Sequence, residues 1–227
     1  MPPQTTIIVP ALNSAATLGA SLASVRGFPG LHELIVVDGG SVDGTVAIAA
    51  AQGARVVHAP AGRGVQLAAG AAVATGDWLL FLHSDTCLTV DGIAEAEAFI
   101  SNPANGDAAA AFRMTLDDER PAARWVEWIA ATRTRILALP YGDQGLLISR
   151  RLYDTVGGFR PIAIMEDVDI ARRLGRKRIH LFQSAVVTTA ERYRKHGFWW
   201  RPIRNLSCLT LWFLGVSPET IARIYNR

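Results

Sequence analysis

Short apolar runs alternate with helical segments through the first part of the chain. Each run is rich in β-branched or large apolar residues and is bounded by Pro, Gly, Asn or Asp, which is typical of strands. The predicted strands are Thr5–Val9, Leu34–Val37, Arg55–His58 and Trp78–Leu82. Between them, the spacing and alanine content predict helices after Asn13 or Ser14, over Val46–Gln52 and over Val65–Ala74. This alternation predicts an α/β fold with a parallel, Rossmann-like sheet.

The second part of the chain is less regular. Its predicted strands are Ala108–Met114, Gln144–Ser149 and one or two within Arg178–Thr189. Its predicted helices are Pro121–Leu139, a helix from Met165 to about Leu174, and a last one beginning near Ser217 and Pro218. In the first of these helices an apolar stripe is expected to pack in the core: Trp125, Trp128, Ile129, Thr132 and Ile136.

The strand Trp78–Leu82 has five unbroken apolar residues, which predict burial on both faces of the sheet. His83, Ser84 and Asp85 follow it directly. In open α/β sheets, ligands bind at the carboxyl ends of the strands. Asp85 is therefore a candidate for holding a metal ion against phosphates, although it would also suit the cap of the next turn or helix.

Other acidic residues are expected at the same edge of the sheet. Asp38 follows a predicted strand, and Glu166 and Asp167 open a predicted helix. A divalent ion bridging phosphate oxygens would compensate such a gathering of carboxylates. Because Glu166 and Asp167 are adjacent, we expect only one to face the reacting centre as a general base. Together with Asp169 they also suit plain capping of a helix N-terminus.

Several common site patterns are absent from the sequence. The segment Gly62–Leu67 has leucine in the third glycine position of a dinucleotide-binding loop and follows the wrong strand. A Walker-type phosphate loop, a Gly-x-Ser-x-Gly elbow and a His-Glu-x-x-His pair are also missing. Of the five histidines, His83 and His196 are retained as candidates.

Composition and charge fit one globular domain of 227 residues, 50% of them hydrophobic and 19% charged. From Arg172 onward there are 12 Lys or Arg and two acids, whereas residues 1–171 carry 11 basic and 18 acidic residues. A basic tail on an acidic body suggests an anionic partner. Two cysteines, no signal peptide and no apolar stretch long enough to span a membrane predict a cytoplasmic protein.

Five motifs in order resemble a family 2 glycosyltransferase of the GT-A fold. They are Ile7-Ile-Val-Pro-Ala-Leu-Asn13, Ile35-Val-Val-Asp-Gly-Gly-Ser-Val-Asp-Gly-Thr45, Gly76–Asp85, Gly157-Gly-Phe159 and Glu166-Asp167. Gly62–Gly70 and Tyr141–Gly145 are similar to a small bacterial branch found near radical-SAM or arsenosugar pathways.

The resemblance implies one GT-A domain over residues 1–227, with a mixed, mainly parallel central sheet flanked by helices. Residues 1–90 would form the nucleotide-binding half, residues 91–190 the acceptor and catalytic half, and residues 191–227 a basic aromatic segment. It implies an inverting transfer from a UDP- or GDP-linked sugar to a small-molecule or lipid acceptor, assisted by Mn²⁺ or Mg²⁺. Nucleic acid is not an expected partner.

The resemblance also assigns roles to matching positions. The base and ribose would lie against Pro10, Ala11, Leu12, Asn13 and Asp38. Further contacts to the nucleotide sugar would come from Arg63, His83, Ser84 and Asp85, with Asp85 holding the metal. Asp167, with its neighbour Glu166, would supply the base, and Asp143 and Gln144 would lie on the acceptor side.

This sequence departs from the family pattern at two positions. His83 takes the place of the first acid of the Asp-x-Asp motif, and the usual Asp-Asp-Gly-Ser is Asp38-Gly39-Gly40-Ser41. A later metal ligand or phosphate-binding group is expected in this fold, for which His196, Arg192 and Arg201 are candidates.

Two other functions stay open from the sequence. A sugar-phosphate nucleotidyltransferase would need a basic glycine-rich loop after the first strand, where this chain has Pro10-Ala-Leu-Asn-Ser14. A non-catalytic or membrane-surface module is suggested by His83 and by the aromatic, basic segment Tyr193–Arg204. Peripheral contact with the inner face of a membrane is compatible with either an enzyme or a module.

Overall fold

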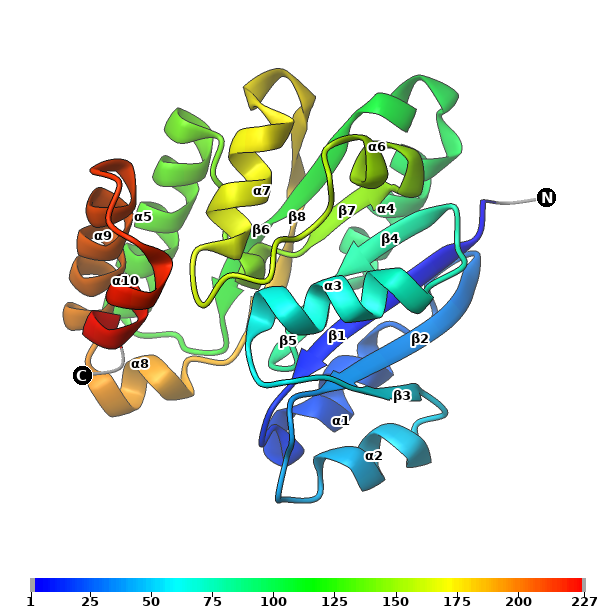
Figure 1. The fold of residues 1–227 in the computed structure, drawn as a ribbon, viewed down its shortest axis with the longest axis horizontal. Helices are drawn as coiled ribbons and strands as arrows, with labels where there is room; N and C mark the ends of the chain where they lie inside the picture. Colours follow the sequence, from blue (N-terminus) through cyan, green and yellow to red (C-terminus); the bar gives the residue numbers. More distant parts are fainter. Residues whose placement is uncertain (1–2, 226–227) are drawn as a thin grey trace.

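One mixed sheet runs through the computed structural model, which describes residues 3–225 (Figure 1). Within those residues it has eight strands in the order β3-β2-β1-β4-β7-β6-β8-β5. The strands are β1 (Thr5–Ala11), β2 (Leu31–Asp38), β3 (Arg55–His58), β4 (Trp78–Phe81), β5 (Thr86–Leu88), β6 (Ala109–Leu116), β7 (Leu146–Ser149) and β8 (Ile179–Thr188). Strands β1 to β4 are parallel as predicted, whereas β7 and β5 run antiparallel to their neighbours.

Helices cover both faces of the sheet. They are α1 (Ala15–Ser24), α2 (Thr45–Ala51), α3 (Arg63–Val73), α4 (Val90–Ser101), α5 (Pro121–Leu137), α6 (Arg150–Thr155), α7 (Glu166–Leu174), α8 (Glu191–His196), α9 (Trp200–Phe213) and α10 (Pro218–Tyr225), with 3-10 turns at Pro103–Asp107, Gly142–Gln144 and Arg176–Arg178. Helices α1, α2 and α4 pack on one face, and α3, α6 and α7 on the other. Helices α5, α9 and α10 stand together at the end of the molecule that carries the C-terminus (Figure 1).

Alternate residues of the central strands enter the cores on opposite faces. In β1, Ile7 and Val9 join the core beneath α1, while Ile8 joins the core beneath α3. In β4, Leu80 joins the first of these cores and Leu79 joins the second. All five of these side chains in β1 and β4 are fully buried. The prediction that Trp78–Leu82 contains a strand buried on both faces is confirmed.

Several element boundaries differ from the prediction. Strand β1 continues through Pro10 to Ala11, because its ladder with β4 ends at Ile8 and Pro10 has no amide hydrogen bond to lose there. Helix α3 begins at Arg63, so this arginine belongs to the first turn of the helix and not to the preceding loop. Gln144 lies in a 3-10 turn, and β7 begins at Leu146.

The predicted core stripe of α5 is wrong for Trp128 and Ile136, whereas Trp125 is partly buried against the core. Trp128 and Ile136 are 64% and 61% exposed, and the buried face instead carries small or medium side chains: Ala123, Val126, Ala130 and Thr134. These residues let α5 approach β6 closely, so the larger side chains point toward α9 or solvent. Trp125 accordingly packs on Trp199, with 4.3 Å between ring centroids.

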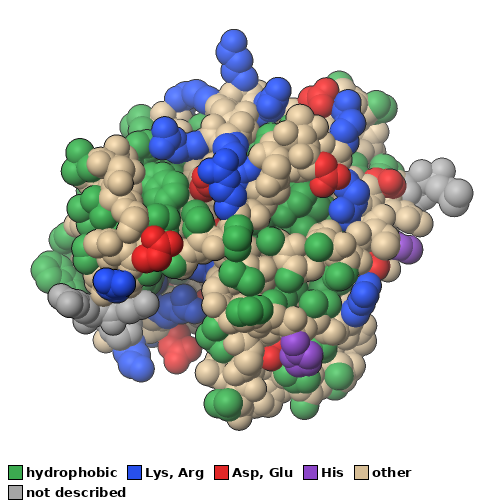
Figure 2. Space-filling view, in the orientation of Figure 1, with side chains coloured by type: hydrophobic (Ala, Val, Ile, Leu, Met, Phe, Trp, Pro, Cys, Tyr) green, Lys and Arg blue, Asp and Glu red, His purple; other side chains and the backbone are tan. Residues whose placement is uncertain are grey.

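The end of the molecule formed by α5 and α9 exposes further large apolar side chains. Those of α9 and its flanks include Trp199, Trp200, Ile203, Leu206, Phe213 and Leu214. Figure 2 shows hydrophobic side chains gathered at the same left-hand end. Across residues 3–225, no helix combines the length and apolar character that crossing a bilayer requires.

Candidate active site

A cleft lies where β4 ends and the C-terminal helices approach the sheet. It is lined by residues from distant parts of the chain, including Arg63, His83, Asp85, Tyr141, Gly142, Asp143, Asp167, Thr188, Thr189, Arg192, Tyr193, Arg201, Asn205 and Tyr225. Seven of the residues singled out from the sequence therefore meet in one place: Arg63, His83, Asp85, Asp143, Asp167, Arg192 and Arg201. The lining includes both carboxylates and guanidinium groups, and the guanidinium groups suit an anionic ligand.

Asp85 is held at the cleft by its backbone. Its carbonyl oxygen accepts a hydrogen bond of 3.1 Å from the amide of Thr189, just beyond β8. Its carboxylate Oδ2 lies 3.9 Å from the Arg192 guanidinium, and the side chain is largely shielded from solvent. The segment after β4 thus places the Asp85 carboxylate in the cleft. The position of Asp85 after a buried strand agrees with the prediction from the apolar run.

His83 also lines the cleft and packs closely against Gly142. Its Nε2 atom is buried and has no hydrogen-bond partner among the described residues. A Cβ atom on Gly142 would overlap the imidazole ring, so only glycine permits this approach. Burial lowers the pKa of His83 to about 4, and the positive charge of Arg63 acts in the same direction. The ring is therefore neutral at neutral pH.

Glu166 and Asp167 face different surroundings, as expected for adjacent residues. Met165 adopts a left-handed conformation, with φ of +68°, immediately before α7. Asp167 lines the cleft, and its Oδ2 accepts a 3.0 Å hydrogen bond from the amide of Gly142.

Glu166 is buried and does not line the cleft. Its Oε1 lies 3.2 Å from Nε of Arg63. Burial raises the pKa of Glu166, and the Arg63 guanidinium offsets part of that effect. Glu166 thus holds Arg63 in position, while Asp167 faces the cleft.

The two predicted acceptor-side residues, Asp143 and Gln144, also lie in different surroundings. Asp143 lines the cleft, and its buried Oδ1 has no hydrogen-bond partner among the described residues. Burial raises the pKa of Asp143, against the opposing charge of Arg133.

Gln144 is buried outside the cleft, and its side-chain amide forms hydrogen bonds within the protein. Its amide nitrogen donates to the carbonyl of Phe112, and its oxygen accepts from Arg133, Thr134 and the amide of Tyr141. These contacts indicate that Gln144 has a structural role.

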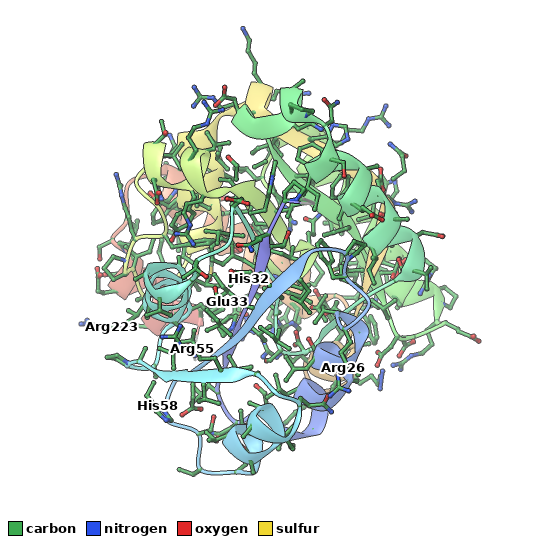
Figure 3. The ribbon with its side chains drawn as sticks, turned by 90° about the vertical axis from the view of Figure 1, so that its right-hand side faces the viewer. Arg26, His32, Glu33, Arg55, His58 and Arg223 are labelled. Atoms are coloured by element: carbon green, nitrogen blue, oxygen red, sulfur yellow. The ribbon has the colours of Figure 1, made fainter. Side chains whose placement is uncertain are left out.

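The residues predicted to cradle the base and ribose lie beside the cleft and not in its lining. Asp38 is 2% exposed, and its carboxylate accepts hydrogen bonds from the amides of Gly40 and Ser41. Figure 3 shows His58 on the edge strand β3, where its Nδ1 lies 3.3 Å from Asp38. Leu12 is 46% exposed. A 2.9 Å hydrogen bond joins Ser14 to Ser84, which links this region to the residue before Asp85.

Pro10 and Ala11 end β1, and hydrogen bonds hold Ala11 and Asn13 beside β2. Asn13 has a positive φ, donates its amide hydrogen to Ser41 and accepts from Val42 through its side chain. Gln66 of α3, which the sequence did not single out, donates to the carbonyls of Ala11 and Val37 at 2.9 and 2.7 Å. It therefore ties the ends of β1 and β2 together.

The C-terminal segment supplies the far wall of the cleft. Arg192 and Arg201, two candidates for a phosphate-binding group, both line it. Sequence reasoning missed Tyr193, Asn205 and Tyr225, although the aromatic and basic residues of 193–204 were a signal. Burial raises the pKa of Tyr193 to about 12, so its hydroxyl stays protonated at neutral pH. His196 ends α8, and its side chain is outside the described part of the structure.

Metal-binding groups are sparse in this cleft. Within the described residues, no three His, Cys, Asp or Glu side chains come together as a ready-made metal site. The described cleft instead places three arginines, Arg63, Arg192 and Arg201, near the carboxylates of Asp85 and Asp167. Such an arrangement can bind an anion and accept a proton.

Comparisons with known proteins identify the family of the chain. The family model described as "Glycosyl transferase family 2" matches residues 6–163. A PGL/p-HBAD biosynthesis glycosyltransferase from Mycobacterium tuberculosis is 44% identical over 107 residues, which cover 43% of this chain and 42% of that protein. The matched part of this chain thus spans about two fifths of the length of that curated relative.

Two solved structures are similar in fold. Glucosyl-3-phosphoglycerate synthase from Mycobacterium tuberculosis, in complex with Mn²⁺, uridine diphosphate and glucosyl-3-phosphoglycerate, is 25% identical with a TM-score of 0.57, covering 82% of this chain and 70% of that one. A mannosyltransferase from Pyrobaculum calidifontis, in complex with GDP-Man and Mn²⁺, is 19% identical with a TM-score of 0.68, covering 100% of this chain and 69% of that one. The predicted GT-A fold, a mainly parallel sheet flanked by helices, is confirmed.

Proposed function

The chain belongs to glycosyl transferase family 2, and on this premise we propose that it moves a sugar from a nucleoside-diphosphate sugar to an acceptor hydroxyl with inversion at the anomeric carbon. One observation carries the proposal: Asp85 and Asp167, from the end of a central strand and the start of a helix, line one cleft with Arg63 and Arg192. A cleft of this kind offers charge for a leaving diphosphate and a base for an acceptor.

The diphosphate is proposed to lie against the arginines of the cleft. Arg63, Arg192 and Arg201 come from α3, α8 and α9, so they would approach the phosphate oxygens from several directions. Glu166 keeps the Arg63 guanidinium in place. The relatives with solved structures bind UDP or GDP-Man, which supports a UDP- or GDP-linked donor here.

The nucleoside is proposed to lie beside the ends of β1 and β2. Leu12 is exposed there, and Asn13 is held by Ser41 and Val42. The Asp38 carboxylate already accepts two backbone hydrogen bonds, so we propose that it shapes this surface through Gly40 and Ser41. The Ser14–Ser84 hydrogen bond would fix the position of the nucleoside region relative to the diphosphate region.

A divalent ion fits this cleft as a partner of the substrate. Mg²⁺ and similar ions often take one or two protein carboxylates, with phosphate oxygens and waters filling the other positions. Asp85 would hold such an ion. Bound with the donor, Mn²⁺ or Mg²⁺ would neutralise charge on the departing diphosphate.

Asp167 is proposed to act as the general base. Its carboxylate would take the proton of the acceptor hydroxyl as that oxygen attacks the anomeric carbon. The bond from the anomeric carbon to the diphosphate breaks on the opposite face, and its electron pair leaves with the phosphate oxygen. The amide of Gly142 orients the Asp167 carboxylate for this step.

Replacement of Asp167 by Asn tests this mechanism. We expect transfer to fall by about 100- to 10,000-fold, the usual contribution of a general base, with donor binding retained. Asp154→Asn on the exposed side of α6 is the matched control and should leave turnover unchanged. Turnover would be measured with UDP- and GDP-sugars and Mn²⁺ or Mg²⁺.

Two results would overturn the proposal. Asp167→Asn protein with full activity would exclude Asp167 as the base. Intact protein that binds no nucleotide sugar with any divalent ion would exclude the donor class. Release of pyrophosphate from a nucleoside triphosphate would instead support the nucleotidyltransferase alternative.

A further inference from the structure

A second cavity, of about 220 Å³, opens between α5 and α9 next to the cleft. Most of its wall is apolar and comes from Met114, Trp125, Val126, Ile129, Ala130, Pro202, Ile203, Leu206 and Leu209. A dry apolar cavity of about 150 Å³ is large enough to take a benzene ring. This cavity is therefore large enough for a substituted aromatic ring or a short alkyl chain.

The cavity adjoins the cleft. Four residues line both spaces: Tyr141, Asp143, Tyr193 and Asn205. Its polar groups are these shared residues and Arg133, so polarity rises toward the cleft. A molecule that spans both spaces would place an apolar group between the helices and a polar group near Asp143 and Asp167.

Most polar groups at the junction are already engaged, but Asp143 is not. The Arg133 guanidinium donates to Leu139 and Gln144 and lies over the Tyr141 ring. The buried Oδ1 of Asp143 has no hydrogen-bond partner among the described residues. A buried acceptor without a partner is costly, and a ligand hydroxyl would satisfy it.

The mouth of the cavity favours apolar groups as well. Ile203 and Leu206, both in its wall, are 50% and 63% exposed. Trp199 is 60% exposed beside Trp125, which also lines the cavity. An apolar group therefore passes apolar side chains as it enters.

We propose that this cavity binds an apolar portion of the acceptor, an aromatic ring or an alkyl chain, and so selects amphiphilic acceptors. The proposal rests on the proposed function, because it places the acceptor hydroxyl in the same cleft. Asp143 would accept a hydrogen bond from the polar part of the acceptor and so position it.

Matched variants of α5 test the site. Ile129→Trp would fill the cavity, whereas Ile136→Trp places the same change on the exposed part of the same helix, where Ile136 is 61% exposed. Circular dichroism and binding of UDP or GDP would show that each variant folds. Ile129→Ala, which enlarges the cavity, gives a second measurement if Ile129→Trp fails to fold.

The probes are octyl and methyl β-glucoside, kept below the micellar concentration and titrated by calorimetry. We expect the octyl compound to bind intact protein at least tenfold more tightly than the methyl compound. Ile129→Trp should abolish this preference, Ile129→Ala should change it, and Ile136→Trp should preserve it. Vesicles with a glucosylated diacylglycerol provide a second arm, in which binding that Ile129→Trp removes would show that the apolar group comes from a lipid.

Equal binding of both glucosides by intact protein, or an unchanged octyl preference in Ile129→Trp, would overturn this inference. Hydrolysis of the donor is measured separately. Donor turnover without an octyl preference would contradict only the cavity assignment. An octyl preference without binding of any nucleotide sugar would contradict the proposed function and leave the cavity as an apolar binding site.

Discussion

The ends of β1 and β2 differ sharply from the cleft beyond β4. At the first, Asp38, Asn13 and Gln66 find hydrogen-bond partners within the protein. At the second, polar atoms of His83 and Asp143 are buried without partners among the described residues. The first region is a scaffold whose polar groups are satisfied within the protein. The second region has buried polar atoms to which a ligand would form hydrogen bonds.

Carboxyl groups show the same difference. Burial alone would raise the pKa of Asp38, but hydrogen bonds from Ser41 and Gly40 outweigh it and lower the pKa. Burial raises the pKa of Asp143, which lacks such donors. Hydrogen bonds from the backbone thus distinguish the structural carboxylate of Asp38 from the carboxyl group of Asp143, which lines the cleft.

The strongest test of the cleft is Asp85→Asn. Removing the charge that we propose to face the diphosphate or its ion should lower turnover by about 100- to 1000-fold, the scale of losing one electrostatic stabiliser. Asp91→Asn, in the exposed first turn of α4, is the control. Steady-state kinetics over a range of Mn²⁺ would check it, and full activity at every concentration would remove Asp85 from the site.

The scaffold is tested by Gln66→Leu. The carbonyls of Ala11 and Val37 would lose a buried donor, so the free energy of unfolding should fall by about 1–3 kcal/mol. Gln52→Leu, which loses only an exposed hydrogen bond to Arg26, should change it by less than about 0.5 kcal/mol. Urea unfolding measures both, and equal losses would contradict a special role for Gln66.

Arginine replacements compare the cleft with the outer surface. Arg192 faces Asp85 in the cleft, while Arg194 pairs with Asp117 and Asp118 outside it. We expect Arg192→Ala to weaken donor binding by about tenfold, the range of one charge-assisted contact, and Arg194→Ala to leave it unchanged. Calorimetric titration with UDP distinguishes the two, and similar affinities would place the diphosphate elsewhere.

The contributions of Asp38 and Asp143 to the free energy of unfolding should depend on pH with opposite signs. The folded-state pKa of Asp38 lies below its ordinary value of 3.8, so its stabilising contribution is complete above that pH and is lost as pH falls below it. The folded-state pKa of Asp143 lies above 3.8, so its ionisation destabilises the fold at higher pH and the penalty is relieved as pH falls. NMR titration of both carboxyls would check the signs, and a pKa of Asp143 below that of Asp38 would contradict them.

The parallel half of the fold was predictable because its signals are local. Apolar runs and the residues that end them sufficed for β3 and β4 and for the place of Asp85. Helix α5 shows the limit of such reasoning. Which stripe of a helix faces the core depends on how closely its neighbour approaches, and the sequence does not specify that β6 packs on Ala123 and Ala130.

The sequence indicated a residue of the cleft only where that residue follows or opens a predicted element. Asp85 and Asp167 are such residues and both line the cleft, while the role of Asp167 as a base stays a prediction. The separation of Glu166 from Asp167, and of Asp143 from Gln144, depends on partners such as Arg63 and Arg133 that lie far away in the chain. Tyr225 could not be placed at all, because it lies far along the chain from the strands that position Asp85.

The spread of cleft residues along the chain also has a consequence during protein synthesis. Arg63 and Asp85 leave the ribosome early, together with strands that pair with near neighbours in sequence. Arg201, Asn205 and Tyr225 leave it much later. Because chains fold from the N-terminal end during translation, the scaffold can form first while the wall of the cleft is still missing. A nascent chain would therefore be folded in part well before it is competent to act.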